Sequence, residues 1–576
     1  MFKLLRFLKG LALVCAIGAP LLMVIEVLMD LQQPTLMSQI VDIGIRNGDL
    51  RYVLTTGLKM LGCALIGLIG GAGCTVLSSV AAIRMSRDMR AALFAKIQTF
   101  SFRELDRFKT SSLITRLTND VTQVQNMMMM AMRMLVRAPV TCIGGIVMAI
   151  SISPRLSLIL ALAMPILLIA MFFIITRSFP LFRVVQNKID RMNDVTRENL
   201  LGIRVTKAFV CEDRQRERFN ASNDDLMNTV MHASRISVIL WPIINIVINA
   251  CIIAVFWFGG RMVIGGELEI GKIMAFISYI TQILASLMMS VMFIMFFTRA
   301  KVSADRINEV FDTSTSIYDV PNAESVSGTD LEFRNVSFRY SDTAEYTLRD
   351  LNFTIPAGES VGIIGATGSG KSSLVSLIPR LYDPSEGEIL LGGKDLRQLK
   401  LHDIRAHIGM VLQESILFSG KVSDIFHFGQ DDLTEAEMEK AASDAQALDF
   451  ICEKENGFDS AVEQRGRNFS GGQKQRLSIG RTLARNPSIL ILDDATSAVD
   501  LATEAKLQRA IKAREGTCTL IIIAQRISAV MGLDRVFVID NGQLVDAGTH
   551  RELMARCEIY RSIAASQLGE EAAIHV

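Results

Sequence analysis

The sequence predicts a multidomain fold, with an all-α part of six membrane-spanning helices followed by an α/β part built on a mostly parallel sheet. At 576 residues the chain is too long for a single core, so two or three domains are expected. Half of the residues are hydrophobic while 21% are charged, which indicates that the apolar residues are concentrated in one region. Six apolar segments long enough to cross a bilayer lie before residue 300, and from Leu331 onward short β-rich runs alternate with amphipathic helical patterns.

The six predicted spans differ in how they are connected. They lie near 11–40, 55–82, 132–153, 156–178, 236–258 and 270–298. Short turns join each odd-numbered span to the next one, whereas the connections 83–131 and 179–235 are long, polar and rich in Lys and Arg. Because positive charge stays on the cytoplasmic side, the long connections are expected in the cytosol. Six is an even number, so both chain ends are predicted to be cytosolic as well.

Three regions follow from these patterns. Residues 1–311 are predicted to form the transmembrane domain, 312–330 a polar linker, and 331–576 the α/β domain. The long cytosolic connections keep helical periodicity, so the membrane helices are expected to extend beyond the bilayer. They should reverse at tips near 102–112 and 202–212, which are natural places for contact with a cytosolic domain.

The α/β part begins with a glycine-rich loop between a strand and a helix. The pattern Gly365-x4-Gly370-Lys371-Ser372 has the spacing of a phosphate-binding P-loop. Backbone N–H groups of such a loop turn toward phosphates, Lys371 reaches the β- and γ-phosphates, and Ser372 holds Mg²⁺. The predicted loop residues are Gly365, Ala366, Thr367, Gly368, Ser369, Gly370, Lys371, Ser372 and Ser373. The chain is therefore predicted to bind a nucleoside triphosphate.

Two further patterns lie downstream of the loop. The apolar run 489–492 ends in Asp493 and Asp494, and in a parallel P-loop sheet this acidic end lies near the phosphates, where Asp493 can hold Mg²⁺. Between the two, the segment 469–473 opens a helix and offers N–H donors and a hydroxyl to an anion. Late in the domain, 536–540 and 543–546 read as a hairpin with a type I′ turn.

The net charge and the cysteine spacing argue against a nucleic-acid-binding, zinc-binding or disulfide-rich protein. The net charge of +1 gives no basic field for nucleic acid, so no nucleic-acid partner is predicted. The nine cysteines are scattered singly, without a CxxC pair or a Cys/His cluster, so neither structural zinc nor a disulfide framework is expected.

In this order and spacing, the patterns resemble those of ABC transporters, specifically exporters with six membrane helices fused to one nucleotide-binding domain. The resemblance covers essentially the whole chain, including the segment 198–209 in the second cytosolic tip. It implies that Tyr340 stacks on adenine, that Gln413 is the Q-loop glutamine near Mg²⁺, and that Asp493 is the Mg²⁺ aspartate. It also implies a D-loop at 497–500 and a signature motif that completes a partner's ATP site, formed by Ser470, Gly471, Gly472 and Gln473.

Two positions depart from the family pattern, and in the family both hold residues that take part in ATP hydrolysis. The family has Glu directly after the Mg²⁺ aspartate to activate water, whereas this chain has Asp494. Its carboxylate is drawn back by roughly 1 Å, a misplacement that can cost about 10²-fold in rate. The family has His at the switch position, whereas Gln525 can hydrogen-bond the γ-phosphate but cannot titrate. Either change alone could be a tolerated variant, but together they predict a catalytic set (Asp494, Gln525 and Gln413) that hydrolyses ATP poorly.

The resemblance implies composite ATP sites, in which one chain's P-loop faces the signature of a second half-transporter. The signature is intact here and the hydrolytic pair is not, so a heterodimer is favoured over a homodimer. The lead prediction is an ATP- and Mg²⁺-dependent exporter subunit that moves amphipathic drug-like molecules or lipids across the plasma membrane by alternating access. Both termini and the nucleotide-binding domain would be cytoplasmic. Two alternatives stay open: a regulatory or gating subunit that binds ATP with little hydrolysis, and a slow homodimeric exporter that uses Asp494 as base.

Charged residues in the membrane part carry two interpretations. Glu26 and Asp30 lie four apart and share one face of the first predicted span. They would either favour cationic substrates, or simply make a hydrogen bond between helices or lie near the outer interface. Arg133 and Arg137 have the same spacing and are expected on a solvated cytosolic extension.

Overall fold

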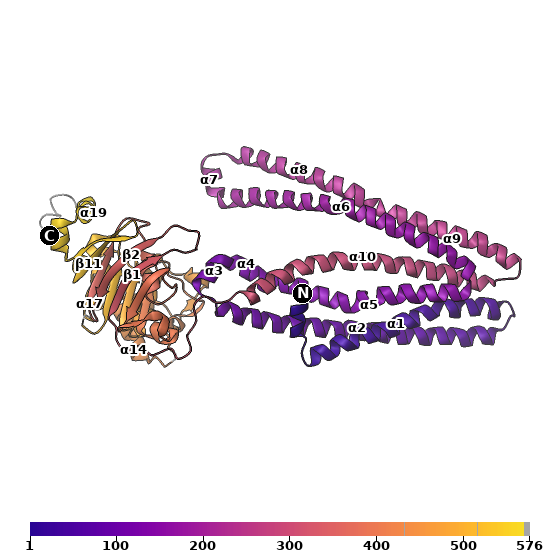
Figure 1. The fold of residues 1–576 in the computed structure, drawn as a ribbon, viewed down its shortest axis with the longest axis horizontal. Coiled ribbons are helices and arrows are strands. Elements are labelled where there is room, and N and C mark those ends of the chain that lie inside the picture. Colours follow the sequence, from indigo (N-terminus) through magenta and orange to yellow (C-terminus); the bar gives the residue numbers. More distant parts are fainter. Residues whose placement is uncertain (431, 515, 569–576) are drawn as a thin grey trace. The chain divides into compact units, whose positions relative to one another are not determined.

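The computed structural model describes residues 1–430, 432–514 and 516–568 (Figure 1). Residues 569–576, which the predicted α/β domain includes, lie outside the described residues. The chain forms two compact units. The first comprises Met1–Gln98 and Ser111–Thr313, and the second comprises Thr99–Thr110 and Ser314–Val576. The second unit therefore takes in a short segment from the first half of the sequence.

Long helices make up the first unit. Up to residue 313 the elements are η1 Phe2–Phe7, α1 Leu11–Gln39, η2 Ile40–Ile45, α2 Leu50–Gln98, α3 Phe102–Phe108, α4 Thr110–Thr115, η3 Arg116–Asp120, α5 Val121–Ile152, α6 Pro154–Leu201, α7 Ile203–Ala208, α8 Glu212–Val238, α9 Leu240–Ile264 and α10 Ile270–Asp312. Of these, α3 belongs to the second unit. In Figure 1, α6 and α8 lie side by side, and the chain reverses between them at α7.

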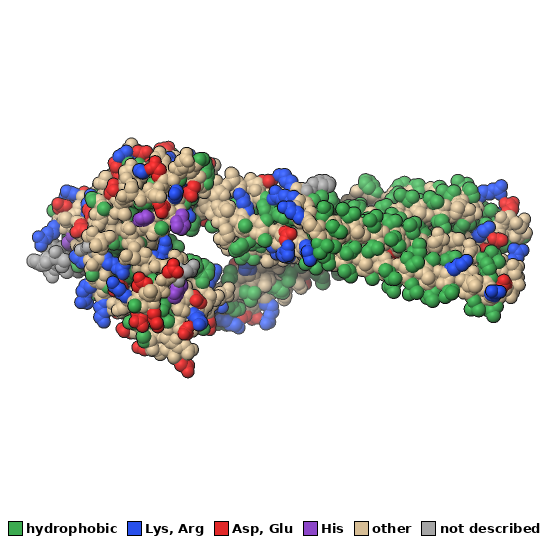
Figure 2. All heavy atoms as spheres, turned by 90° about the horizontal axis from the view of Figure 1, so that it is seen from below, with side chains coloured by type: hydrophobic (Ala, Val, Ile, Leu, Met, Phe, Trp, Pro, Cys, Tyr) green, Lys and Arg blue, Asp and Glu red, His purple; other side chains and the backbone are tan. Residues whose placement is uncertain are grey.

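Several of these helices are much longer than a bilayer is thick. The lengths of α2, α6 and α10 are 49, 48 and 43 residues. At 1.5 Å per residue they reach about 65–75 Å, against a hydrocarbon core of about 30 Å. Hydrophobic side chains gather over one stretch of the helices and charged ones at their ends (Figure 2). Each of these helices is therefore longer than a bilayer crossing requires.

Hydropathy identifies the spans within the described residues. Five helical stretches are long and apolar enough to cross a membrane: Leu11–Ile45, Leu50–Gln98, Thr110–Ile152, Pro242–Ile264 and Ile270–Asp312. They overlap five of the six predicted spans. The remaining predicted span corresponds to the start of α6, where the apolar stretch Pro154–Ala170 is shorter.

Three charged side chains meet inside the helical unit. Arg137 of α5 donates from Nη2 to Asp30 Oδ2 of α1 at 3.0 Å and from Nη1 to Glu26 of the same helix. Gly71 of α2 makes room for them, because a Cβ there would lie 2.7 Å from Glu26 Oε2. The expectation that Arg137 lies on a solvated extension is therefore wrong. The Arg137 guanidinium forms charge-assisted hydrogen bonds with both acids and so joins α5 to α1. This agrees with the second interpretation of Glu26 and Asp30.

The second unit is an α/β fold with two larger sheets. Its strands are β1 Leu331–Phe338, β2 Leu348–Ile355, β3 Ser360–Ile364, β4 Glu386–Leu391, β5 Lys394–Asp395, β6 Ile408–Val411, β7 Gly420–Lys421, β8 Ala461–Val462, β9 Ile489–Asp493, β10 Thr519–Ile523, β11 Arg535–Asp540 and β12 Gln543–Gly548. The six-stranded sheet has the order β12-β11-β3-β10-β9-β6 and is parallel except for β12. The four-stranded antiparallel sheet has the order β2-β1-β4-β5.

Helices and short turns connect these strands. They are α11 Lys371–Leu377, η4 Leu396–Gln398, α12 Leu401–His407, α13 Val422–Phe426, α14 Glu435–Asp444, α15 Leu448–Cys452, η5 Gly457–Asp459, η6 Gln464–Gly466, α16 Gly471–Ala484, α17 Leu501–Lys512, η7 Ile527–Ala529, α18 His550–Arg556 and α19 Glu558–Leu568. The predicted hairpin is formed by β11 and β12. Its turn residues Asn541 and Gly542 both have positive φ, as a type I′ turn requires.

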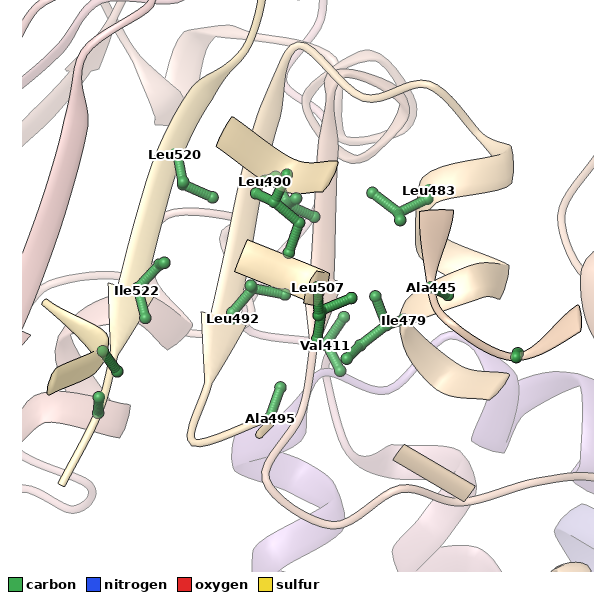
Figure 3. Packing of buried hydrophobic residues seen from close by; sticks show 14 of the residues in the cluster. Val411, Ala445, Ile479, Leu483, Leu490, Leu492, Ala495, Leu507, Leu520 and Ile522 are labelled. Atoms are coloured by element: carbon green, nitrogen blue, oxygen red, sulfur yellow. The ribbon is translucent and has the colours of Figure 1, made fainter. Parts of the chain in front are cut away.

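The core beside the parallel sheet positions the acidic end of β9. All five residues of β9 are buried, as expected for a strand covered on both faces. Leu490 and Leu492 point toward Ile479 and Leu483 of α16 (Figure 3). This packing fixes the strand, so that Asp493 at its end has a defined position.

Candidate nucleotide-binding site

The loop between β3 and α11 has the backbone geometry of a phosphate cradle. Gly368 and Gly370 have φ of +84° and +98°, which residues with a Cβ rarely adopt. At Gly365, a Cβ would lie 2.0 Å from the Ile539 carbonyl oxygen. The glycines of the pattern are therefore required by the turn and by the close approach of β11.

Lys371 is folded over this loop. Its Nζ donates to the carbonyl oxygens of Gly365 at 2.9 Å and Ala366 at 2.8 Å. Burial lowers the pKa of Lys371, while the nearby Asp493 and Asp494 carboxylates counteract that effect. The lysine thus lies on the phosphate side of the loop and is held by acceptors that a phosphate oxygen could replace.

The predicted magnesium ligands are adjacent. Ser372 Oγ at the start of α11 donates to Asp493 Oδ1 at 3.0 Å. Burial raises the pKa of Asp493, and the neighbouring Asp494 adds to the rise, while the Ser372 bond lowers it. A hydroxyl and a buried carboxylate at this separation are oxygen ligands of the type that Mg²⁺ takes beside phosphates, so the residues present fit that ion.

Asp494 is surrounded by amide donors. Its Oδ2 accepts from Gln525 Nε2 at 3.0 Å and from Gln413 Nε2 at 3.4 Å. Its backbone has φ of +50°, a left-handed conformation in which Asp is enriched over most residues. Its N–H donates to the Ile523 carbonyl of β10 at 3.0 Å. The three residues that the sequence assigns to catalysis therefore form one cluster at the end of the parallel sheet.

The charge state of Asp494 gives a stability prediction. Burial raises its pKa above the ordinary value of 3.8, although bonds from Gln413 and Gln525 and the nearby cations oppose the rise. Ionisation of Asp494 therefore opposes folding, fully above the folded-state pKa and not at all below the unfolded value. We expect Asp494→Asn to raise the melting temperature of the nucleotide-free protein at neutral pH, with a gain that shrinks as the pH falls toward 4.

Asp534→Asn is the matched control for that measurement. Asp534 accepts from the Ser360 hydroxyl at 2.6 Å and the Ser360 N–H at 2.9 Å, and these bonds lower its pKa. Loss of the Asp534 carboxylate should therefore lower the melting temperature at neutral pH. The measurement is the melting temperature of the wild type and both variants as a function of pH. A lower melting temperature in Asp494→Asn than in the wild type at neutral pH would contradict the prediction.

Tyr340 has an accessible ring beside the loop. It follows β1, its side chain is 43% exposed, and its hydroxyl bonds Ser373 Oγ of α11 at 2.8 Å. Its ring meets the Phe338 ring edge-on with centroids 4.9 Å apart. An aromatic face tied to the P-loop helix and open to solvent is suited to stacking on a base.

The signature residues begin α16. Ser470 caps this helix, its Oγ accepts from Gln473 N at 3.3 Å, and its N–H donates to Gln473 Oε1 at 3.0 Å. Gly472 is required because a Cβ there would lie 2.8 Å from the Ala498 carbonyl oxygen. Ser470 and Gly471 are exposed, so their polar groups face outward from this chain.

One residue of this region escaped the sequence analysis. Gln475 of α16 donates to Ser497 Oγ at 3.3 Å and accepts from Ala498 N at 3.0 Å. It therefore joins the signature helix to the D-loop segment. The sequence shows that Gln475 lies three residues after Gly472, but it does not show that Gln475 contacts Ser497 and Ala498.

Comparisons with known proteins agree with this geometry. The family model described as the ABC transporter transmembrane region matches residues 16–287, and the model described as ABC transporter matches 348–497. YfiB of Bacillus subtilis, named an uncharacterized ABC transporter ATP-binding protein, is 39% identical over 571 residues, covering 99% of each chain. Rv1273c of Mycobacterium tuberculosis, similarly named, is 39% identical over 554 residues, covering 95% of each.

A solved structure matches both regions together. It is that of a bacterial Atm1-family ABC exporter with ATP bound, at a TM-score of 0.79 and 26% identity, covering 96% of this chain and 98% of that one. The chain thus aligns with these relatives over nearly its whole length. It contains a phosphate loop, a strand (β9) that ends in Asp493, and a glycine-containing helix (α16) capped by Ser470. The chain, which carries the membrane region and the nucleotide-binding region in one polypeptide, belongs to the ABC transporter family.

Proposed function

We propose that this ABC transporter chain is one half of a heterodimeric, ATP-driven exporter and that it carries the weakly hydrolysing ATP site. The observation that supports this most is the cluster of Asp494, Gln525 and Gln413. A short carboxylate held by two neutral amides has neither the reach of glutamate nor a titratable imidazole beside it. The same chain keeps the phosphate loop, the lysine and the buried aspartate, which are the parts needed for binding.

ATP binding is assigned to the residues around the loop. Tyr340 stacks on adenine, 365–373 surrounds the phosphates, and Lys371 compensates their charge. Ser372, Asp493 and Gln413 would hold the Mg²⁺ ion that accompanies ATP, and that ion would supply charge compensation for the phosphates. Ser470, Gly471, Gly472 and Gln473 face away to complete the ATP site of the partner half-transporter.

Export is supported by the family and by the solved relative. The matching structure is described as an exporter, and it covers 96% of this chain, including both the membrane region and the nucleotide-binding region. We assign alternating access in the plasma membrane, with cytoplasmic termini and an amphipathic drug-like molecule or lipid as cargo. The apolar helix surfaces suit such a cargo.

The test is ATPase activity of the purified chain in lipid, alone and then with its partner half-transporter. Low activity alone and restored activity with the partner are expected. A complex that contains the Lys371→Ala variant should still hydrolyse ATP. The reason is that most hydrolysis takes place at the partner's ATP site, which this chain's signature completes. Loss of all activity in that variant complex would contradict the assignment.

A slow homodimer is the second candidate, favoured by one property of Asp494. Its carboxylate directly follows Asp493 and is held by Gln525 and Gln413, at the position where the family pattern has the glutamate base. Brisk hydrolysis by the chain alone would establish this candidate in place of the heterodimer. Tight ATP binding without hydrolysis, alone and with the partner, would instead indicate a regulatory or gating subunit.

A further inference from the structure

The short helix α3 is bound to the nucleotide-binding unit by polar contacts at its start. Ser101 donates to Glu104 Oε2 from its N–H at 2.8 Å and its hydroxyl at 2.6 Å, and Ser316 N–H donates to Glu104 Oε1 at 3.3 Å. Burial alone would raise the pKa of Glu104, but these bonds outweigh it and lower that pKa. The carboxylate is therefore charged at neutral pH, and α3 has a fixed point of attachment.

A second attachment runs through Tyr382. Its hydroxyl donates to Asp106 Oδ2 of α3 at 2.6 Å, and its ring lies 5.9 Å from the ring of Phe102. Burial and the Asp106 carboxylate raise the pKa of Tyr382, so the phenol remains a donor at every physiological pH. Tyr382 thus touches α3 through both its ring and its hydroxyl.

Tyr382 also touches the residue assigned to adenine. The rings of Tyr340 and Tyr382 meet edge-on, with centroids 5.3 Å apart and planes at 89°. Tyr340 in turn bonds Ser373 of the P-loop helix at 2.8 Å. A continuous set of contacts therefore runs from Ser373 through Tyr340 and Tyr382 to Asp106.

The surroundings leave these rings room to move. A cavity of about 290 Å³ is lined by Arg103 of α3, by Ser316, and by both tyrosines. Arg103 crosses it to Asp342 at 3.1 Å. Both rings pack on the buried Phe338 ring but border this cavity as well. Because one side is open, Tyr340 can change its tilt when a base stacks on it, and Tyr382 can follow.

We propose that Tyr382 is a positioning residue that conveys nucleotide occupancy from Tyr340 to α3 through its bond to Asp106. The proposal rests on the proposed ATP site, since Tyr340 must meet the base. Stacking on adenine changes the position of the Tyr340 ring and hence its edge contact with Tyr382. The hydroxyl of Tyr382, held by a charged acceptor, transfers that displacement to the helix.

The test measures amide hydrogen exchange of residues 99–110 in the full chain in lipid nanodiscs, with and without ATP and Mg²⁺. In the wild type, ATP should change exchange in this segment by about threefold or more. Tyr382→Phe keeps the ring and should still bind ATP, yet lose that response. Asp106→Ala should lose it as well, whereas Asp106→Asn, whose carbonyl still accepts a hydrogen bond, should retain it.

Tyr346→Phe is the matched control. The Tyr346 hydroxyl also donates to a carboxylate, that of Glu386, but none of the contacts just described involves it. This variant should respond to ATP as the wild type does. A wild-type response that survives in Tyr382→Phe, or ATP binding that leaves 99–110 unchanged in the wild type, would overturn the proposal. Absence of ATP binding in the wild type would overturn the ATP site itself, which the separate affinity measurement reveals.

Discussion

Replacing Asp494 by glutamate is expected to raise the rate of ATP hydrolysis at this chain's own site by about 10- to 100-fold. The added methylene advances the carboxylate by roughly 1 Å beyond the position where Gln525 and Gln413 now hold it. From there it can orient and deprotonate a water molecule in line with the γ-phosphate. Phosphate release from the chain in lipid, alone and with its partner, measures the change.

Lys371→Ala in the Asp494→Glu background is the control for the origin of the gain. The lysine lies over the loop, and its loss should remove the added activity if that activity arises at this site. An unchanged rate in Asp494→Glu would contradict the prediction and would make Gln525, rather than carboxylate reach, the limiting feature. The left-handed backbone at residue 494 adds a cost, because glutamate adopts this conformation less readily than aspartate.

Replacing Arg137 by methionine is expected to destabilise the helical unit by about 1–3 kcal/mol. The substitution keeps an extended side chain but leaves Glu26 and Asp30 without the cation that joins α5 to α1. Glu26 is only 16% exposed, so water compensates it poorly. Thermal or denaturant unfolding in detergent gives the loss.

Arg155→Met is the matched variant for this measurement. Arg155 pairs with Glu267 at 2.8 Å, but their side chains are 77% and 56% exposed. A surface pair of this kind contributes little, so a change within about 0.5 kcal/mol is expected. Adding Glu26→Gln to Arg137→Met should recover part of the loss. Equal small effects of Arg137→Met and Arg155→Met would show that the part-buried cluster of Arg137, Glu26 and Asp30 is unimportant for stability.

Local patterns predicted the parts of this molecule that depend on neighbouring residues. The loop glycines, the hairpin turn at Asn541 and Gly542, and the helix start at Ser470 are each set within a few residues, so spacing alone identifies them. Family resemblance then supplied roles for Tyr340 and Gln413, which no local pattern reveals.

Contacts between distant segments were not predictable in this way. Helical periodicity places Arg137 on a face of α5, but it does not say that two acids of α1 lie opposite, more than a hundred residues away. Likewise, Tyr382 follows a short helix as an ordinary half-buried aromatic residue, and its partner Asp106 is 276 residues distant. Such pairs are determined by tertiary packing, and a single sequence contains no signal for them.

The second unit is discontinuous in sequence, since it includes Thr99–Thr110 as well as the residues from Ser314 onward. A fragment that starts at Leu331 would therefore lack Asp106 and Phe102, and its Tyr382 would present an uncovered phenol and ring to water. In such a fragment the Tyr382 ring would keep its contacts with Phe338 and Tyr340 but lose those with α3, so the aromatic surface next to the nucleotide site would differ from that of the intact chain. Nucleotide affinities obtained on the excised domain would then differ from those of the intact chain, and supplying residues 99–110 as a separate peptide should bring them back together.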